Sequence, residues 1–483
     1  MTFADPKDAR IAELEAQLAA RDERLAEVVT QLRWALAQIA ELEAKLAQNS
    51  TNSSKPPSSD PPGVSRQPSK PTGRKPGGQP GHKGHKRELL PVEQVDQVVS
   101  LVPDECSRCH GSVSEKSDAP EPLRHQVTEM PPVKPHVTEY QQCFGYCASC
   151  ETWTAAPLPA GVPIGAFGVR LTALMSLLSG QYRLSKRMVQ DLLSNVLGVD
   201  LSLGSVSKLE GNVSAALEAP VEQARQHVQQ AQVAHVDETG WREGRRKAWL
   251  WTAVTSMVTV FLIAASRGGG VAKRMLGESF TGFLVTDRWS AYLWMDLYLR
   301  QLCWSHLLRD FQSFVDRGGE SASIGEALLK QGRRMFKWWH RVRDGTLSRR
   351  LFERRMRAVE REVGRLLREA EVCPDAKTAG MAAEILKLEP ALWTFVQVEG
   401  LEPTNNAAER AIRPAVLYRK GCFGTHSPEG SRFVERMLTV VATLRQQNRN
   451  VLEFLTTAYD AHLRGLPAPS LLPESPAPLA LAA

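Results

Sequence analysis

A seven-residue repeat near the start of the chain constrains its fold more than any other feature. Apolar residues recur at every seventh position from Ile11 to Leu46, and a second series three residues behind runs from Leu14 to Leu42, weakened by Arg21 and Ala35. Such a seam is typical of a long helix that pairs with another helix. Residues 1–48 are therefore predicted to form a coiled coil that makes the protein a homo-oligomer. The alternative is a lone amphipathic helix folded onto the body.

The composition then changes sharply, because Pro, Gly, Ser, Lys and Arg replace nearly all large apolar residues. Residues 49–90 are predicted to form a flexible basic linker, since they cannot bury enough surface to offset their ordering entropy. Around Arg74 and Lys75 the linker is narrow enough to bind a DNA backbone or minor groove, although a basic spacer explains it equally well. The Pro-, Ala- and Leu-rich residues 466–483 are predicted to be a disordered tail.

Two Cys-x-x-Cys pairs lie within residues 91–160, namely Cys106 with Cys109 and Cys147 with Cys150. Four thiolates can close a tetrahedral structural Zn²⁺ site, whereas a redox dithiol would need only one pair. Because the chain opens without a secretory signal, we expect a cytoplasmic protein and metal binding rather than disulfides. The sequence therefore predicts a small zinc-binding module. The isolated cysteines are expected to be buried packing residues: Cys303, Cys373 and Cys422.

Residues 161–230 are predicted to be helical. The stretch from Arg183 to Lys208 breaks at Gly198, and its second helix opens near Ser202 or Ser205. This pattern fits either a helix-turn-helix that binds DNA or an ordinary packed helix pair. The uncharged stretch Trp249–Ser266 is long enough to span a membrane, but its Val and Thr content favours two buried strands, so no membrane association is expected.

Positive charge is concentrated in one region. Residues 330–368 contain 14 Lys and Arg against 4 Asp and Glu, while the whole chain has a net charge of +7. Residues 303–395 have a helical pattern, so this charge lies on helices that also carry Trp338 and Trp339. Contact with DNA phosphates is favoured over a merely solvated charged face.

Three carboxylates are candidates for metal-dependent phosphodiester chemistry. Asp237 and Asp287 each end an apolar, strand-like run, and Glu409 lies at the start of a predicted helix. Two Mg²⁺ ions about 4 Å apart, held by carboxylates, can activate an attacking oxygen and stabilise a leaving oxygen. By spacing alone, the aspartates could equally be turn residues, and Glu409 could form a capping box with Asn406. Arg410 and Arg413 are placed to bind phosphates.

Taken in order, the motifs resemble the insertion sequence 66 family of bacterial transposases. After the heptads, the resemblance rests on segments rich in polar and small residues, listed here in chain order: Asn52 to Ser58, Gly73 to His82, the two cysteine pairs, His235 to Thr239, Thr286-Asp287, Cys303 to His306 with Arg309, and Asn405 to Pro414. Two residues, Arg288 and Trp289, stand where Gly-Tyr or a similar pair is expected.

The resemblance implies a ribonuclease-H-like catalytic core formed by residues 231–318 and 396–465, interrupted by a helical insertion at 319–395. It also implies that Asp237, Asp287 and Glu409 bind catalytic Mg²⁺ or Mn²⁺, and that small accessory proteins exist. Glu238 is excluded, because adjacent strand residues face opposite sides.

The sequence therefore predicts a multidomain α+β protein with a coiled coil, a zinc-binding module, a helical DNA-binding region and the catalytic core. Its expected function is that of a nucleoid-associated bacterial transposase, which cleaves double-stranded DNA at terminal inverted repeats and joins it to target DNA. The alternatives are a non-catalytic, zinc-containing DNA-binding protein and a structure-selective nuclease.

Overall fold

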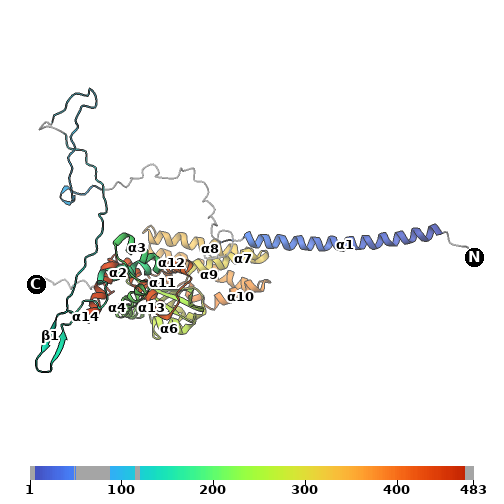
Figure 1. Ribbon diagram of the computed structural model, residues 1–483. Coiled ribbons are helices and arrows are strands. Elements are labelled where there is room, and N and C mark those ends of the chain that lie inside the picture. The colour runs from blue at the N-terminus through green and yellow to red at the C-terminus, as the bar shows by residue number, and fades with distance from the viewer. Residues whose placement is uncertain (1–5, 48, 50–87, 115–119, 474–483) are drawn as a thin grey trace, which may run out of the picture.

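The structure, a computed structural model, describes residues 6–47, 49, 88–114 and 120–473. Arg74, Lys75 and most of the expected linker lie outside these residues. The protein is a mixed α+β protein, as predicted. Figure 1 shows a body (residues 169–473), a long helix that projects away from it, and an extended segment that carries a hairpin.

The projecting helix is α1, which runs from Pro6 to Ala47. Its apolar seam is open to solvent, with Leu18 63% and Leu25 62% exposed. The helix is therefore not folded onto the body, and that alternative is wrong (Figure 1). Pairing with a second helix stays a prediction.

Residues 88–168 form the extended segment. Its described residues are almost all exposed, and its regular elements are one short 3-10 helix and an antiparallel hairpin: η2 (Val92–Gln94), β1 (Phe144–Cys147) and β2 (Thr152–Ala155).

A five-stranded sheet lies at the centre of the body, in the order β5-β4-β3-β6-β7. Neighbours are antiparallel from β5 to β3 and parallel from β3 to β7. The strands are β3 (Val233–Glu243), β4 (Arg246–Val254), β5 (Thr259–Ala264), β6 (Phe283–Thr286) and β7 (Arg300–Leu302). Most of the uncharged stretch Trp249–Ser266 thus forms two buried strands, as predicted. No helix in the described part of the chain is long and apolar enough to cross a membrane.

Helices that precede the sheet strands in the sequence and helices that follow them pack into one hydrophobic core with the sheet. Leu177, Val213 and Val228 pack in the same cluster as Trp251 of β4, so the helical region 161–230 is not separate from the sheet. The helices and 3-10 turns of this part are α2 (Val169–Gly180), α4 (Leu203–Ala216), α5 (Glu218–Gln229), α6 (Gly269–Leu276), η3 (Ser290–Tyr292), η4 (Leu297–Leu299), α13 (Pro428–Gln446) and α14 (Val451–Arg464).

The predicted helix pair is present. Helix α3 (Lys186–Leu197) ends at Gly198, whose φ of 63° is the left-handed conformation that favours glycine, and α4 opens at Ser202, whose hydroxyl accepts the N–H of Ser205. The buried face of α4 packs against α2, α13 and α14. DNA binding by this pair stays a prediction.

The long helical stretch after β7 builds a second core around Phe311, Leu328, Phe352 and Leu367. Trp339 lies inside this core, against Phe352 and Phe395, so the expectation that it contacts DNA is wrong. The elements are α7 (Trp304–Arg317), α8 (Gly319–Arg343), α9 (Arg349–Glu371), α10 (Ala376–Leu386), η5 (Glu389–Leu392) and α11 (Thr394–Gln397), followed by α12 (Asn406–Cys422).

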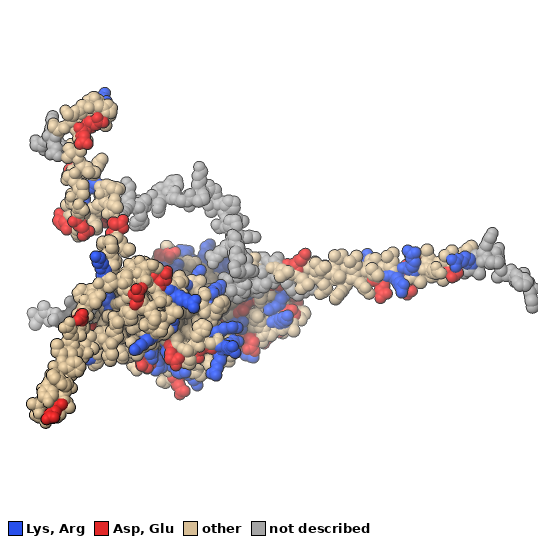
Figure 2. All heavy atoms as spheres, in the orientation of Figure 1, with Lys and Arg blue, Asp and Glu red and all other residues tan. Residues whose placement is uncertain are grey.

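Lys and Arg side chains stand out over the body in the face shown in Figure 2, while the hairpin β1–β2 shows none. Within the basic stretch, Trp338 lies partly buried between the guanidinium groups of Arg334 and Arg355, 4.7 and 5.4 Å from its ring. Some of the charge is used internally, since Arg365 pairs with two glutamates of its own helix.

The first part of the expected disordered tail is packed on the body. Leu471 is buried, and its carbonyl accepts a hydrogen bond from Gln447. Disorder was therefore wrongly expected for residues 466–473, and residues 474–483 lie outside the described part. Cys303 and Cys373 are buried as expected, whereas Cys422 is exposed.

Candidate active site

Two of the three predicted carboxylates lie on neighbouring parallel strands. Asp287 directly follows the end of β6, whereas Asp237 lies inside β3, which continues to Glu243, so the strand does not end at Asp237 as the apolar run suggested. The register pairs Val233 with Phe283 and His235 with Val285. Asp237 and Asp287 each follow two residues after the last of these pairs. The Asp287 carboxylate accepts the backbone N–H of Trp289 (2.9 Å), and the buried Arg300 donates to the backbone carbonyl of Asp287 (3.0 Å). The loop that carries Asp287 is thus fixed from two sides.

The third carboxylate, Glu409, is in the first turn of α12. The residue before this helix, Asn405, is buried and connects two elements: its side-chain amide donates to the Val236 carbonyl (2.7 Å), and its backbone N–H donates to the Sγ atom of Cys303 (3.1 Å). These bonds tie the start of α12 to β3 and to the start of α7, and so bring Glu409 toward the aspartates.

The capping-box alternative for Glu409 is wrong. Helix α12 has Asn405 at its N-cap and no side-chain capping bond. The Oε1 atom of Glu409 is buried and has no hydrogen-bond partner. A buried acceptor without a partner is costly, so the carboxylate is placed for something other than holding its own helix.

The three carboxylates influence one another electrostatically. Burial, together with repulsion from Glu238, Asp287 and Glu409, raises the pKa of Asp237 to about 8. The hydrogen bond from the backbone N–H of Glu238 (2.9 Å) opposes this shift only in part. Like charges in a low-dielectric site disfavour joint ionisation, and a divalent cation among them would reverse that preference.

His306 and Cys303 adjoin this cluster. The His306 Nδ1 atom is 3.5 Å from Glu409 Oε1, and burial is the main cause that lowers the pKa of this imidazole. Ligand atoms of Cys303, His306 and Glu409 all lie within 4.8 Å of one another, so these side chains could hold a metal ion. Among the described residues, the ligand atoms of Asp237, Asp287 and Glu409 do not form so tight a group.

The residues that depart from the family pattern stabilise the loop after Asp287. Arg288 forms an ion pair with Asp310 (2.8 Å), and the ring of Trp289 lies 3.9 Å from the guanidinium of Arg267. Glu238 is occupied on the other side of β3, where it accepts hydrogen bonds from Arg267 and Tyr292.

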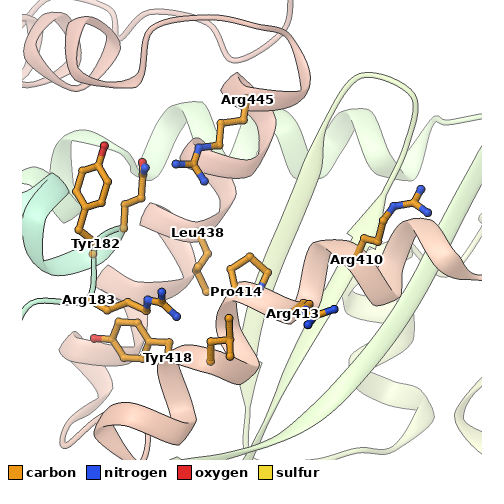
Figure 3. A pocket seen from close by; sticks show the side chains of 11 residues that line it. Tyr182, Arg183, Arg410, Arg413, Pro414, Tyr418, Leu438 and Arg445 are labelled. Atoms are coloured by element: carbon orange, nitrogen blue, oxygen red, sulfur yellow. The ribbon is translucent and has the colours of Figure 1, made fainter. Parts of the chain in front are cut away.

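Arg410 and Arg413 line a cavity of about 370 Å³ next to Glu409. Figure 3 shows that Arg183 and Arg445 join them from two other segments. The sequence carried no signal for these two residues, because only the fold places them beside α12.

The two cysteine pairs each form a tight local turn. Backbone N–H groups of Arg108 and Cys109 lower the pKa of the Cys106 thiol, and the N–H of Cys150 does the same for Cys147. One thiol of each pair therefore ionises more readily than a free cysteine, which suits half of a zinc site. However, the segment before residue 115 and the hairpin lie at opposite ends of this part of the chain (Figure 1), so the structure does not bring the four thiols together.

The chain is similar to a curated relative and matches two family models. A curated relative, an uncharacterized protein (y4qI) of Sinorhizobium fredii, is 23% identical over 309 residues, which cover 56% of this chain and 55% of the relative. The chain thus matches about half the length of that relative. A family of unknown function (DUF6444) matches residues 4–88.

A second family model, described as the transposase IS66 family, matches residues 165–432, more than half of the chain. This range contains Asp237, Asp287 and Glu409 together with the sheet that positions them. The chain belongs to the IS66 family of transposases.

Proposed function

We propose that this protein is a DNA transposase whose catalytic carboxylates are Asp237, Asp287 and Glu409. The observation that carries the proposal is the way three distant segments meet: β3 and β6 are paired in parallel next to Asp237 and Asp287, and Asn405 ties the start of the helix that carries Glu409 to β3. Burial and the neighbouring acids, Glu238 first among them, also raise the pKa of Asp237, as is common for acids in catalytic centres. Membership of a transposase family supports the same conclusion.

The strand order supports a ribonuclease-H-like core for residues 231–318 and 396–465. Three antiparallel strands are followed by two parallel ones, and the last acid lies on a helix after a helical insertion, which the resemblance implied. The helices of the insertion share a hydrophobic core with β6, β7 and α7, and their arginines lie outside this core. We assign them to binding the transposon ends.

The proposed reaction has two steps at one site. Mg²⁺ or Mn²⁺ held by the three carboxylates would supply the charge that activates the attacking oxygen and stabilises the leaving oxygen. In the first step a water oxygen bonds to phosphorus and the bond to the 3′ oxygen breaks, which leaves a 3′ hydroxyl and a 5′ phosphate. In the second step the oxygen of that hydroxyl bonds to a phosphorus of target DNA, and the bond from this phosphorus to the 3′ oxygen of the target strand breaks, which leaves a new 3′ hydroxyl on the target. Arg410 and Arg413 would hold the phosphates, and His306 would position Glu409.

The remaining assignments follow from the family and the sequence. The substrates are double-stranded DNA at terminal inverted repeats and at the target. Helix α1 would pair two protomers, the four cysteines would bind structural Zn²⁺ after the two pairs approach each other, and small accessory proteins would assist. The cellular site would be the bacterial cytoplasm, near the nucleoid.

The test is cleavage of DNA that carries the inverted repeats flanking the gene, with wild-type and Glu409→Gln protein. Glutamine keeps the shape of the side chain but binds Mg²⁺ poorly, so cleavage is expected to fall roughly a thousandfold. Glu402→Gln, in the loop before α12, is the matched control and should cleave normally.

Three outcomes would contradict the proposal. Normal cleavage by Glu409→Gln protein would remove the metal-binding role. Cleavage by the wild type without joined products would indicate a structure-selective nuclease. Metal-independent DNA binding without any cleavage would indicate a DNA-binding protein that has lost its chemistry.

A further inference from the structure

The cavity beside α12 has an unusual lining of arginines. Four of them come from three separate segments: Arg183 from the loop between α2 and α3, Arg410 and Arg413 from α12, and Arg445 from α13. In Figure 3, Tyr182 and Tyr418 lie on the side of Arg183, Arg445 lies across from them, and Arg413 and Arg410 follow along α12 on the far side of Pro414, with Arg410 pointing outward.

None of these four guanidinium groups has a carboxylate partner among the described residues. Two other arginines of α13, the helix that carries Arg445, do form ion pairs: Arg432 with Glu435, and Arg436 with Glu218. An anion in the cavity would supply the charge partner that the described residues do not provide. Guanidinium groups bind phosphate oxygens in pairs, so phosphate is the anion that this arrangement suits best.

The loop that carries Arg183 is held in a strained conformation. Arg183 has a φ of 62°, in the left-handed region that non-glycine residues rarely adopt. Backbone bonds from Tyr182 to Leu177 and from Leu184 to Leu178 fix the loop on the end of α2. There Gly180 lies so close to α13 that a Cβ atom would be 2.9 Å from Cγ of Met437. Such strain at an exposed arginine is typical of binding sites.

The volume of the cavity and the tyrosine at its edge restrict the kind of ligand that it can bind. A cavity of about 370 Å³ is in the range that holds a small molecule, and it cannot admit a duplex. Tyr182 is 55% exposed at the cavity, which leaves its ring available for stacking with a base. Arg410 and Glu409 lie on the same helix, α12, so the cavity and the carboxylate cluster share an element.

We propose that this cavity binds one unpaired nucleotide of the DNA strand at the cut end. The arginines bind its phosphate and Tyr182 stacks on its base. This assignment rests on the proposed transposase function. Withdrawing a nucleotide from a duplex costs a few kcal/mol of pairing and stacking, and least where the strand is already single. The protein should therefore prefer a duplex with an unpaired 3′ extension to a blunt duplex.

The test measures this preference without catalysis. Fluorescence anisotropy without added Mg²⁺ or Mn²⁺ gives the Kd of a short blunt duplex and of the same duplex with an unpaired 3′ extension. We expect the extended duplex to bind roughly tenfold more tightly. Tyr182→Ala and the double variant Arg183→Gln, Arg445→Gln should bring the ratio close to one. Thermal melting of each variant verifies that it is folded.

Arg187→Gln is the matched control, because Arg187 is an exposed arginine on α3 that does not line the cavity. It should weaken both duplexes alike and leave the ratio unchanged. Equal affinities in the wild type, or a ratio unaffected by the cavity variants, would overturn the proposal. A free nucleoside monophosphate that binds as tightly as the extended duplex would assign the cavity to a soluble nucleotide instead.

The two proposals can fail separately. If Glu409→Gln protein cleaves normally and the preference for the extension persists, the proposed chemistry fails and the cavity assignment stands. If cleavage depends on Glu409 and no preference exists, only the cavity assignment fails.

Discussion

Among single residues, Glu435 is a buried acid that lies outside the carboxylate cluster. Its Oε2 atom accepts the backbone N–H of Ile263 (2.8 Å), and its Oε1 atom is 2.7 Å from Arg432. Burial nevertheless dominates and raises its pKa from 4.5 to about 7. Because the folded chain holds this proton more tightly than the unfolded chain, stability should fall as the pH rises from about 4.5 to about 7, and then level off.

Glu435→Gln should remove this loss, since an amide oxygen can still accept the N–H of Ile263. The melting temperature of the variant, relative to the wild type, should therefore rise between pH 5 and pH 8, with at most about 3 kcal/mol involved. Glu429→Gln is the control on the same helix. Its own backbone N–H and the Ser427 hydroxyl lower the pKa of Glu429, so its relative melting temperature should not rise. Parallel curves for wild type and Glu435→Gln would contradict the assignment.

The sequence predicted the site carboxylates better than it predicted the arginines that lie near them in the fold. Asp237 and Asp287 end apolar runs, and parallel strands bring such residues to one edge. For Glu409, spacing alone left the capping box open, and only the helix start at Asn406 decided against it. Arg183 and Arg445 gave no signal, because their proximity to α12 depends on how three helices pack.

Among the elements, α13 covers the free edge of β5, the outermost strand of the sheet. Glu435, Thr439 and Thr443 are spaced by four residues and accept the N–H groups of Ile263, Phe261 and Thr259 in turn. Four helical residues rise about 6 Å and two strand residues about 6.8 Å, so the two repeats nearly match. The helix therefore satisfies an edge that would otherwise be open to pairing with another strand.

Thr439→Val tests this role. Valine keeps the shape of the side chain but leaves the buried N–H of Phe261 without an acceptor, so the free energy of unfolding should fall by about 1–3 kcal/mol. Thr457→Val is the control, because the exposed Thr457 hydroxyl donates only to the Glu453 carbonyl of its own helix. Denaturant unfolding measures both, and equal losses would mean that the bond across to β5 contributes nothing.

Element type was largely predictable, because periodicity distinguishes the buried strands from the helices. The way in which elements share cores was not. Helices α2, α4 and α5 join the core of the sheet although many residues separate α2 from β3. Composition around Trp338 and Trp339 does not tell which of them faces inward, since both lie between Lys337 and His340 and one helix position decides the outcome.

In the whole molecule, α1 and the body are physically separate, so oligomerisation and catalysis can be tested independently. The helix extends well beyond the body and carries a row of exposed leucines (Figure 1). An open apolar row of this length is stabilised by burial against a partner, and a second copy of the same helix has the matching pattern.

We expect the wild-type protein to be a dimer by light scattering, and the double variant Leu25→Lys, Leu32→Lys to be a monomer, because two charges per helix cannot be buried in the seam. Ala19→Lys, Ala26→Lys adds the same charge on the outer face and should leave the dimer intact. Arg21→Leu should strengthen it, since Arg21 interrupts the seam. If the seam variant keeps the mass of the wild type, α1 does not pair protomers, and the two transposon ends must be held together through the body, where the basic helices α8 and α9 offer the next surface to test.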